Sequence, residues 1–342
     1  MNIMIAISTR NNRILRLDDT LHTMGHNVSF LCMDDYNNQT TYLEKKFDEL
    51  NIGNGRRKYE ENRRRDFFYQ LKYNHIDLIL WINTYHGVIS DEEFLNIDSS
   101  IKQVNWCVDA INEGCDNQVR YLSHMSAIAV LEYRDFLYLR KLGLTNVVYC
   151  PIGYVAAYAE EHDYRRETDI VFVGSPLKNR LKLLEALAKS AKAHQWNLKL
   201  YGPFWEKRYF WKKWVFKLKY PILYKYIHNG SFSAEEVAQI YASSKICLNI
   251  HNEAHKSPNP RTFDILATGA LEIIDKRENY IDKIVPDKAL VEFEDTDDLL
   301  EKVEYYLKHD SEREKIAAYG HEHNIYSMDY SLRILLEKAG CI

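Results

Sequence analysis

The stretch SPNPRTFDILATGALEIID, residues 257–275, has the most informative pattern in this chain of 342 residues. Its two prolines suit a first helical turn, which tolerates a missing N–H group. Phe263 and Leu266 then fall on one face of a predicted short helix, which Gly269 can end. The apolar run Ala270–Ile274 predicts a strand that is buried on both faces.

Polar residues at the start of this predicted helix indicate a binding site. Asn259, Arg261 and Asp264 cluster where the free N–H groups of a first turn point outward. An arginine at a helix start favours an anion, and phosphate is the expected one. An aspartate one turn further in could accept hydrogen bonds from sugar hydroxyls. The alternative is an ordinary helix N-terminus with a solvated arginine and aspartate.

The longer run LNIHNEAHKSPNPRTFDILATGALEIID resembles the nucleotide-sugar signature of GT-B glycosyltransferases, and most of all their CgeB-like, spore-maturation-type branch. That branch shows an LNIH-like strand, then N-x-R-x-F-E and A-x-G-A, and Asp264 takes the place of the glutamate here. A second block, DIVFVGSPLKNRLKLLEAL followed by LKLYGPFW, resembles the opening of the same family's donor domain. The larger group-1 enzymes carry two glutamates eight residues apart, but Lys256 occupies the earlier position in this chain.

The resemblance implies the GT-B fold, an α/β architecture of two Rossmann-like domains that face a cleft. It implies a glycosyltransferase that moves a sugar from a nucleotide diphosphate sugar to a glycan or lipid-linked acceptor, in the synthesis of cell-surface polysaccharides or glycoconjugates. No metal and no cofactor beyond this co-substrate are expected. The implied donor-binding residues are Gly174, Ser175, Arg180, Gly202, His251, Asn259, Arg261 and Asp264.

Alternating strand and helix patterns predict two domains built on parallel sheets. The first turn, STRNNR, contains no glycine, so the G-x-G-x-x-G fingerprint of nicotinamide and flavin enzymes is absent. We expect an acceptor-binding domain over residues 1–153 and a donor-binding domain over residues 165–325. By the family resemblance, a C-terminal helix within residues 326–342 packs back on the first domain.

Two candidates for a catalytic base follow predicted strands of the first domain. Residues just past the strand ends line the crevice of an open α/β sheet. This rule selects His86 after the strand Ile76–Ile82 and Asp109 after the strand Gln103–Val108. Either side chain could take the acceptor's proton. Alternatively, His86 is an ordinary loop histidine and Asp109 a helix N-cap.

His251 and His255 have the i, i+4 spacing of metal ligands on a helix. Their segment is a predicted loop, it lacks a third ligand, and it does not match H-E-x-x-H. We therefore expect no metal site, and we expect His251 to face the sugar or the diphosphate of the donor.

Aromatic and basic residues dominate residues 204–226, FWEKRYFWKKWVFKLKYPILYKY, which contain seven lysines and arginines and a single acid. This composition suits the headgroup layer of an anionic membrane. The predicted membrane contacts are Trp205, Trp211, Lys212, Lys213 and Trp214. A second basic cluster, residues 56–65, lies in the expected acceptor domain. Alternatively, the aromatic residues pack on the second domain, or the segment holds a soluble polyanion such as nucleic acid.

Composition narrows the possible partners and compartments. The net charge of −4 gives no overall nucleic-acid footprint, so nucleic acid is not an expected partner. The six cysteines form no C-x-x-C pair and suit reduced thiols in a cytosolic protein. No apolar run is long enough to span a membrane. We expect a cytoplasmic protein that can dock on the inner face of the cytoplasmic membrane.

Two other functions suit the same architecture. A nucleotide-sugar epimerase would need paired acid and base groups near the sugar, and the sequence has no clear pair. A non-catalytic nucleotide-sugar binding protein would bind without turnover. The fold by itself does not separate these functions from a glycosyltransferase.

Overall fold

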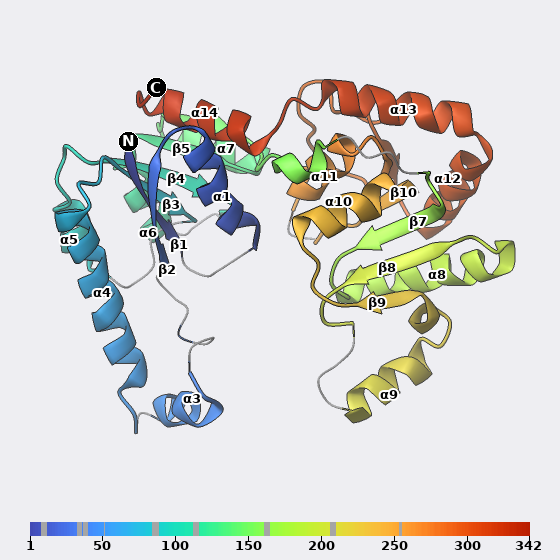
Figure 1. Cartoon of the computed structure of the whole chain (residues 1–342), viewed down its shortest axis with the longest axis horizontal. Helices are drawn as coiled ribbons and strands as arrows, with labels where there is room; N and C mark the ends of the chain where they lie inside the picture. Colours follow the sequence, from blue (N-terminus) through green and yellow to red (C-terminus); the bar gives the residue numbers. More distant parts are fainter. Residues whose placement is uncertain are drawn as a thin grey trace. The chain divides into compact units, whose positions relative to one another are not determined.

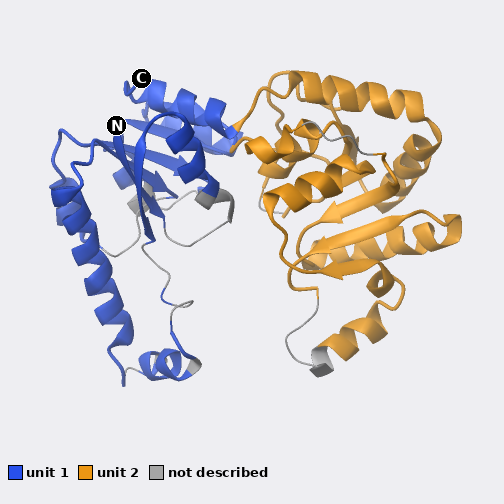
Figure 2. Cartoon of the chain, viewed as in Figure 1, with its two compact units in different colours: residues 1–151, 328–342 blue, residues 152–327 orange. Residues whose placement is uncertain are grey.

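A computed structural model describes residues 1–7, 12–32, 36, 40–50, 52–83, 89–111, 116–160, 165–205, 210–252 and 255–342. The chain divides into two compact units (Figure 2). Unit 1 comprises Met1–Pro151 and Met328–Ile342, and unit 2 comprises Ile152–Ser327. Each unit contains one six-stranded sheet, and the neighbouring strands of each sheet pair in parallel. The predicted α/β class with two Rossmann-like sheets is confirmed.

The sheet of unit 1 has the strand order β2-β1-β3-β4-β5-β6 (Figure 1). The strands β1 and β3 are largely apolar runs, because both faces of a parallel sheet are covered. The strands are β1 (Asn2–Ile7), β2 (Asn27–Cys32), β3 (Leu78–Ile82), β4 (Lys102–Cys107), β5 (Ala127–Val130) and β6 (Val147–Tyr149). The helices are α1 (Asn12–Thr23), α3 (Tyr42–Glu49), α4 (Gly55–Tyr73), α5 (Asp91–Leu95), α6 (Asp116–Leu122), α7 (Tyr133–Lys141) and α14 (Met328–Lys338).

The sheet of unit 2 has the strand order β12-β11-β10-β7-β8-β9. Its strands are β7 (Thr168–Val173), β8 (Leu198–Gly202), β9 (Ile227–Asn229), β10 (Ser244–Asn249), β11 (Leu271–Asp275) and β12 (Val291–Phe293). The α-helices are α8 (Lys178–His194), α9 (Phe210–Lys219), α10 (Ala234–Ala242), α11 (Pro260–Ala267), α12 (Thr296–Lys308) and α13 (Asp310–His323). The described residues of this unit also form two 3-10 helices, η1 (Ala156–Tyr158) and η2 (Leu223–Tyr226).

The last helix, α14, lies in unit 1 although it follows unit 2 in sequence (Figure 2). It contacts β5, β6 and α1. Its residues Leu332, Leu335 and Leu336 are buried, so the C-terminal segment supplies part of the unit 1 core.

The helix predicted within residues 257–275 is α11, and its ends follow the expected chemistry. Asn259 caps its N-terminus with a side chain that accepts a hydrogen bond from the Arg261 N–H, and Pro260 is the first helical residue. Gly269, with φ of +67°, follows the last turn. This turn leads directly into β11, so the N-terminus of α11 is at the carboxyl edge of the parallel sheet, where α/β proteins bind ligands.

No helix in the described part of the chain is long and apolar enough to cross a membrane.

Candidate functional site

Two glycines bring the ends of β7 and β8 together. The Gly174 N–H donates to the Tyr201 carbonyl oxygen at 2.8 Å, and Gly202 has φ of +142°. A Cβ at Gly202 would lie 2.4 Å from the Gly174 carbonyl oxygen. A Cβ at Gly174 would lie 3.2 Å from Nη2 of Arg261. The missing side chains therefore place bare backbone directly beside the arginine.

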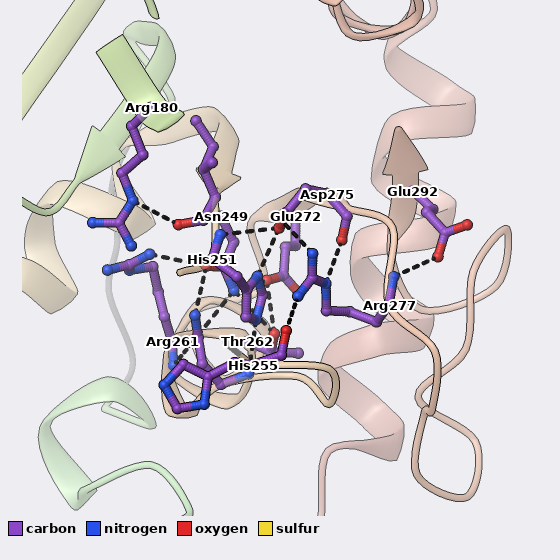
Figure 3. A network of polar contacts seen from close by, with 12 residues as sticks. Arg180, Asn249, His251, His255, Arg261, Thr262, Glu272, Asp275, Arg277 and Glu292 are labelled. Carbon is purple, nitrogen blue, oxygen red and sulfur yellow. Dashed lines mark hydrogen bonds and ion pairs between the residues drawn. The ribbon is translucent and has the colours of Figure 1, made fainter. Parts of the chain in front are cut away.

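Two arginines from different helices converge at this edge of the sheet (Figure 3). Their Cζ atoms lie 5.5 Å (Arg180) and 5.6 Å (Arg261) from the centroid of the Phe172 ring of β7. Arg180 is 6% exposed, and its Nε and Nη1 donate to the carbonyl oxygens of Ile250 and Ser175 at 2.9 and 3.1 Å.

The charges of these two arginines act on each other. Burial, and after it the charge of Arg261, lowers the pKa of Arg180 to about 10, so the Arg180 guanidinium remains charged at neutral pH. Within the described ranges, neither arginine forms an ion pair with an acidic side chain. The pair therefore offers its charge to an anion.

His251 holds the N-terminus of α11 in place. Its side chain is 1% exposed, Nδ1 donates to Oδ1 of Asp275 at 2.7 Å, and Nε2 accepts from the Asn259 N–H at 3.0 Å. Burial lowers the pKa of His251 to about 4, so the imidazole is neutral. Both ring nitrogens have partners inside unit 2, so the role of His251 is to position α11. The prediction that its side chain contacts the donor is wrong.

Asp275 and Arg277 support this histidine, and sequence reasoning did not identify either residue. Asp275 also accepts from the His251 N–H at 3.0 Å and from Nη2 of Arg277 at 2.7 Å. Burial acts to raise the pKa of Asp275, but hydrogen bonds from His251 and the charge of Arg277 hold it below its usual value. An aspartate at the very end of an apolar strand was the available signal.

A polar network lies beneath the N-terminus of α11 (Figure 3). Asn249, at the end of β10, accepts at Oδ1 from Nη1 of Arg261 at 2.9 Å and from Nδ2 of Asn259 at 3.1 Å. Its Nδ2 donates to Oε1 of Glu272 at 2.7 Å. Burial raises the pKa of Glu272 to about 7, and hydrogen bonds from Asn249 and Thr262 oppose that rise. Sequence reasoning missed Asn249 and Glu272, although a glutamate inside the apolar run ALEIID is a visible anomaly.

Two other predicted donor contacts are Ser175 and Asp264. Ser175 follows β7 and its carbonyl oxygen accepts from Arg180, so it lies at the same edge of the sheet. Asp264 is 3% exposed and lies in the second turn of α11. Its negative charge helps to raise the pKa of Tyr241 on α10, although burial is the main cause of that rise. A contact between Asp264 and a sugar hydroxyl stays a prediction.

In unit 1, Asp109 is exposed at the end of β4 and is held by Asn83, which follows β3. Asn83 has φ of +57°, and its Nδ2 donates to Oδ2 of Asp109 at 2.8 Å. Its Oδ1 accepts from the Val108 and Asp109 N–H groups at 2.9 and 3.1 Å. The next helix, α6, begins at Asp116, so Asp109 does not cap it. The other candidate base, His86, lies outside the described residues.

The predicted membrane contacts separate into buried and exposed side chains. Trp205 is 1% exposed, packs on Phe172, and donates from Nε1 to the Gly174 carbonyl oxygen at 2.8 Å. It belongs to the core, so its predicted membrane contact is wrong. Trp214 on α9 is 59% exposed and lies close in sequence to the exposed Val215 and Leu218.

The remaining predicted membrane contacts carry less information. The side chains of Trp211 and Lys212 lie outside what the structure describes. Lys213 is partly buried and interacts within the protein. In the second basic cluster, on α4 of unit 1, most of the arginine charges are paired with carboxylates. Its ion pairs are Arg56–Glu60, Arg57–Glu61, Arg63–Asp66 and Arg64–Glu93.

The described residues contain no group of three or more His, Cys, Asp or Glu side chains that could hold a metal ion.

Sequence comparison matches the chain to a glycosyltransferase-like family model and to a curated spore protein. Residues 180–336 match the family model described as "Glycosyl transferase-like". The spore protein CgeB of Bacillus subtilis is 25% identical over 226 residues, which span 61% of this chain and 66% of CgeB.

Solved structures share the fold over almost the whole chain. A glycosyltransferase from Rickettsia africae superposes with a TM-score of 0.68 at 14% identity, covering 99% of this chain and 97% of its own. Anabaena HepE, solved with UDP-glucose, superposes with a TM-score of 0.67 at 10% identity over the full length of both chains. The predicted GT-B fold and the predicted CgeB-like resemblance are confirmed.

Proposed function

We propose that the chain is a CgeB-like glycosyltransferase with the GT-B fold, and that it moves a sugar from a nucleotide diphosphate sugar held by unit 2 to a glycan or lipid-linked acceptor. One observation carries the donor assignment. Arg180 and Arg261 meet at the carboxyl edge of a parallel sheet without a carboxylate partner in the described part of unit 2.

These two arginines suit the leaving group of a glycosyl transfer. Cleavage of the bond between the sugar and the diphosphate develops negative charge on the diphosphate. Guanidiniums fixed before the reaction stabilise that charge without reorganising, and such electrostatic stabilisation is usually the largest catalytic contribution. The N-terminus of α11 adds the positive end of its helix dipole at the same edge.

The same charges support a reaction that needs no metal ion. Two guanidiniums and a helix N-terminus supply the positive charge that a divalent cation provides in other sites. Nucleoside diphosphate release is therefore expected to persist in the presence of EDTA.

UDP is the first nucleotide to test. HepE, which shares the fold, was solved with UDP-glucose. In the proposed complex the diphosphate lies between Arg180 and Arg261, beside the backbone of Gly174. Asp264 remains the candidate for a ribose or sugar hydroxyl.

The acceptor side of the proposal concerns unit 1. Asp109 is exposed at the carboxyl edge of its sheet, and Asn83 fixes the direction of its carboxylate. A fixed, solvent-facing carboxylate suits a group that orients an acceptor hydroxyl or takes its proton.

A peripheral position on the anionic, inner face of the cytoplasmic membrane is the last part of the proposal. Trp214, Val215 and Leu218 of α9 are 59%, 56% and 65% exposed, and the exposed Lys217 and Lys219 lie between and beyond them. Exposed apolar and basic side chains on one helix suit an anionic headgroup layer, and a lipid-linked acceptor would be found there.

The decisive assay measures free nucleoside diphosphate from a panel of UDP-, GDP- and ADP-sugars, with and without glycan and lipid-linked acceptors. A glycosyltransferase gives release that rises with one acceptor and a product that carries the sugar. An epimerised nucleotide sugar without transfer would support the epimerase alternative. Tight binding of a nucleotide sugar without any turnover would support a binding protein, and either result contradicts the proposal.

A further inference from the structure

Glu272 is a carboxyl group buried in the middle of β11. It is 0% exposed, and its neighbours Leu271, Ile273 and Ile274 are core residues. Oε1 accepts from Nδ2 of Asn249 at 2.7 Å and from Oγ1 of Thr262 at 2.9 Å (Figure 3). Oε2 has no hydrogen-bond partner among the described residues.

Such a residue is a poor choice for stability alone. A buried polar atom without a partner destabilises the folded state, and an apolar side chain would suit the surrounding strand better. The carboxyl group therefore serves the hydrogen bonds of its other oxygen. Those bonds lead to Asn249, which contacts the N-terminus of α11, and to Thr262, which lies in its first turn.

The Asn249 side chain transmits the effect of Glu272 to Arg261. An amide has a donor end and an acceptor end, and its direction is set by its partners. Oε1 of Glu272 offers an acceptor, so Nδ2 of Asn249 turns toward β11. Oδ1 then faces outward, where it accepts from Nη1 of Arg261 at 2.9 Å. Thr262 enforces the same direction, because its hydroxyl accepts from Nδ2 of Asn249 and donates to Glu272.

We infer that Glu272 is a positioning residue of the donor site: by fixing the direction of the Asn249 amide, it holds the Arg261 guanidinium where the donor's diphosphate binds. This inference rests on the proposed function. Glu272 is buried and acts through Asn249, so it contacts neither the donor nor the acceptor.

Titration with UDP and with inorganic pyrophosphate tests the inference, because pyrophosphate carries the diphosphate without a base. Glu272→Gln keeps an acceptor oxygen for Asn249 and Thr262, so both affinities should stay within about threefold of wild type. Glu272→Met fills a similar volume without an acceptor. Its affinities should fall about tenfold or more, as expected when one hydrogen bond to a charged group is lost.

A double-variant cycle separates positioning from general damage to the fold. In an Arg261→Ala background, Glu272→Met should weaken binding no further, because its effect passes through Arg261. Additive losses would overturn the inference, as would wild-type affinity in Glu272→Met. If Glu272→Met does not fold, Thr262→Val removes one of the same hydrogen bonds with little change of shape and takes its place in the cycle. If the wild-type protein binds neither probe, the proposed donor site itself is wrong and the inference falls with it.

Discussion

At the scale of single residues, Arg261 carries the most specific expectation. Loss of a charge-assisted hydrogen bond to phosphate costs about 1.5–3 kcal/mol, which is a roughly 10–100-fold loss of affinity. Isothermal titration of Arg261→Ala with UDP should show that loss. Arg261→Lys keeps the charge but not the planar guanidinium, so its UDP affinity should lie between that of wild type and that of Arg261→Ala.

Lys189→Ala is the matched control for this titration. Lys189 lies on α8, as Arg180 does, and its side chain is 61% exposed. Its replacement should leave UDP affinity unchanged. Wild-type affinity in a folded Arg261→Ala protein would remove the donor assignment.

A second expectation at this scale concerns pH and Glu272. Its pKa is about 7 in the folded state against an ordinary value of 4.5, so between these pH values the native state binds a proton that the unfolded chain has lost. Stability therefore falls as pH rises through this window. His251, with its pKa lowered to about 4 from 6.5, has the opposite effect between pH 4 and 6.5.

Glu272→Gln isolates the glutamate, because the variant retains His251. The free energy of unfolding of wild type minus that of the variant should decrease between pH 5 and 7.5, by at most about 3 kcal/mol. Urea unfolding at several pH values measures this difference. A difference that stays constant across the window would show that Glu272 does not titrate there.

Sequence patterns predicted site residues whose neighbours are close in sequence, and they missed contacts between residues that are far apart in sequence. Asn259 and Arg261 follow from the start of one helix. The partner of His251, Asp275, lies 24 residues away, so the sequence alone did not show that its ring nitrogens are occupied. The basic and aromatic pattern of residues 204–226 likewise did not distinguish Trp205, which packs on Phe172, from the exposed Trp214.

At the scale of elements, α9 gives a direct test of membrane docking. Replacing Trp214 and Leu218 together with alanine removes two exposed apolar side chains, so binding to anionic vesicles should fall strongly while the fold is kept. Wild-type binding should weaken as salt rises, because part of the attraction is electrostatic. Co-sedimentation with vesicles of anionic and of neutral lipid measures both effects.

Leu137→Ala is the control for that experiment, since Leu137 on α7 is 51% exposed but lies outside the basic and aromatic residues 204–226. It should bind vesicles as wild type does. If the wild-type protein ignores anionic vesicles at low salt, α9 is a solvated surface helix and the peripheral location is wrong.

The length of an element decided whether its pattern was visible in the sequence. The helices α8 and α11 have enough residues to show their period, and β11 is visible as an apolar run. β5 has four residues, AIAV, and β9 has three, so neither shows a period that separates a strand from a loop.

At the scale of the whole molecule, the alternation of strands and helices predicted two parallel sheets but not their strand orders. Both sheets place their first strand inside the sheet, so β1 lies between β2 and β3, and β7 lies between β10 and β8. These orders depend on where each crossover returns to the sheet, which local patterns do not encode. The same edge of the second sheet nevertheless collects Gly174, Arg180 and Asn249, which are far apart in sequence.

A crystal structure of the protein with UDP tests this assembly of the donor site most directly. We predict that the diphosphate oxygens lie about 2.7–3.2 Å from guanidinium nitrogens of Arg261 and Arg180, at the N-terminus of α11. Asn249 should still accept from Arg261 in that complex. A diphosphate bound elsewhere, with both arginines free of it, would contradict the proposed donor site.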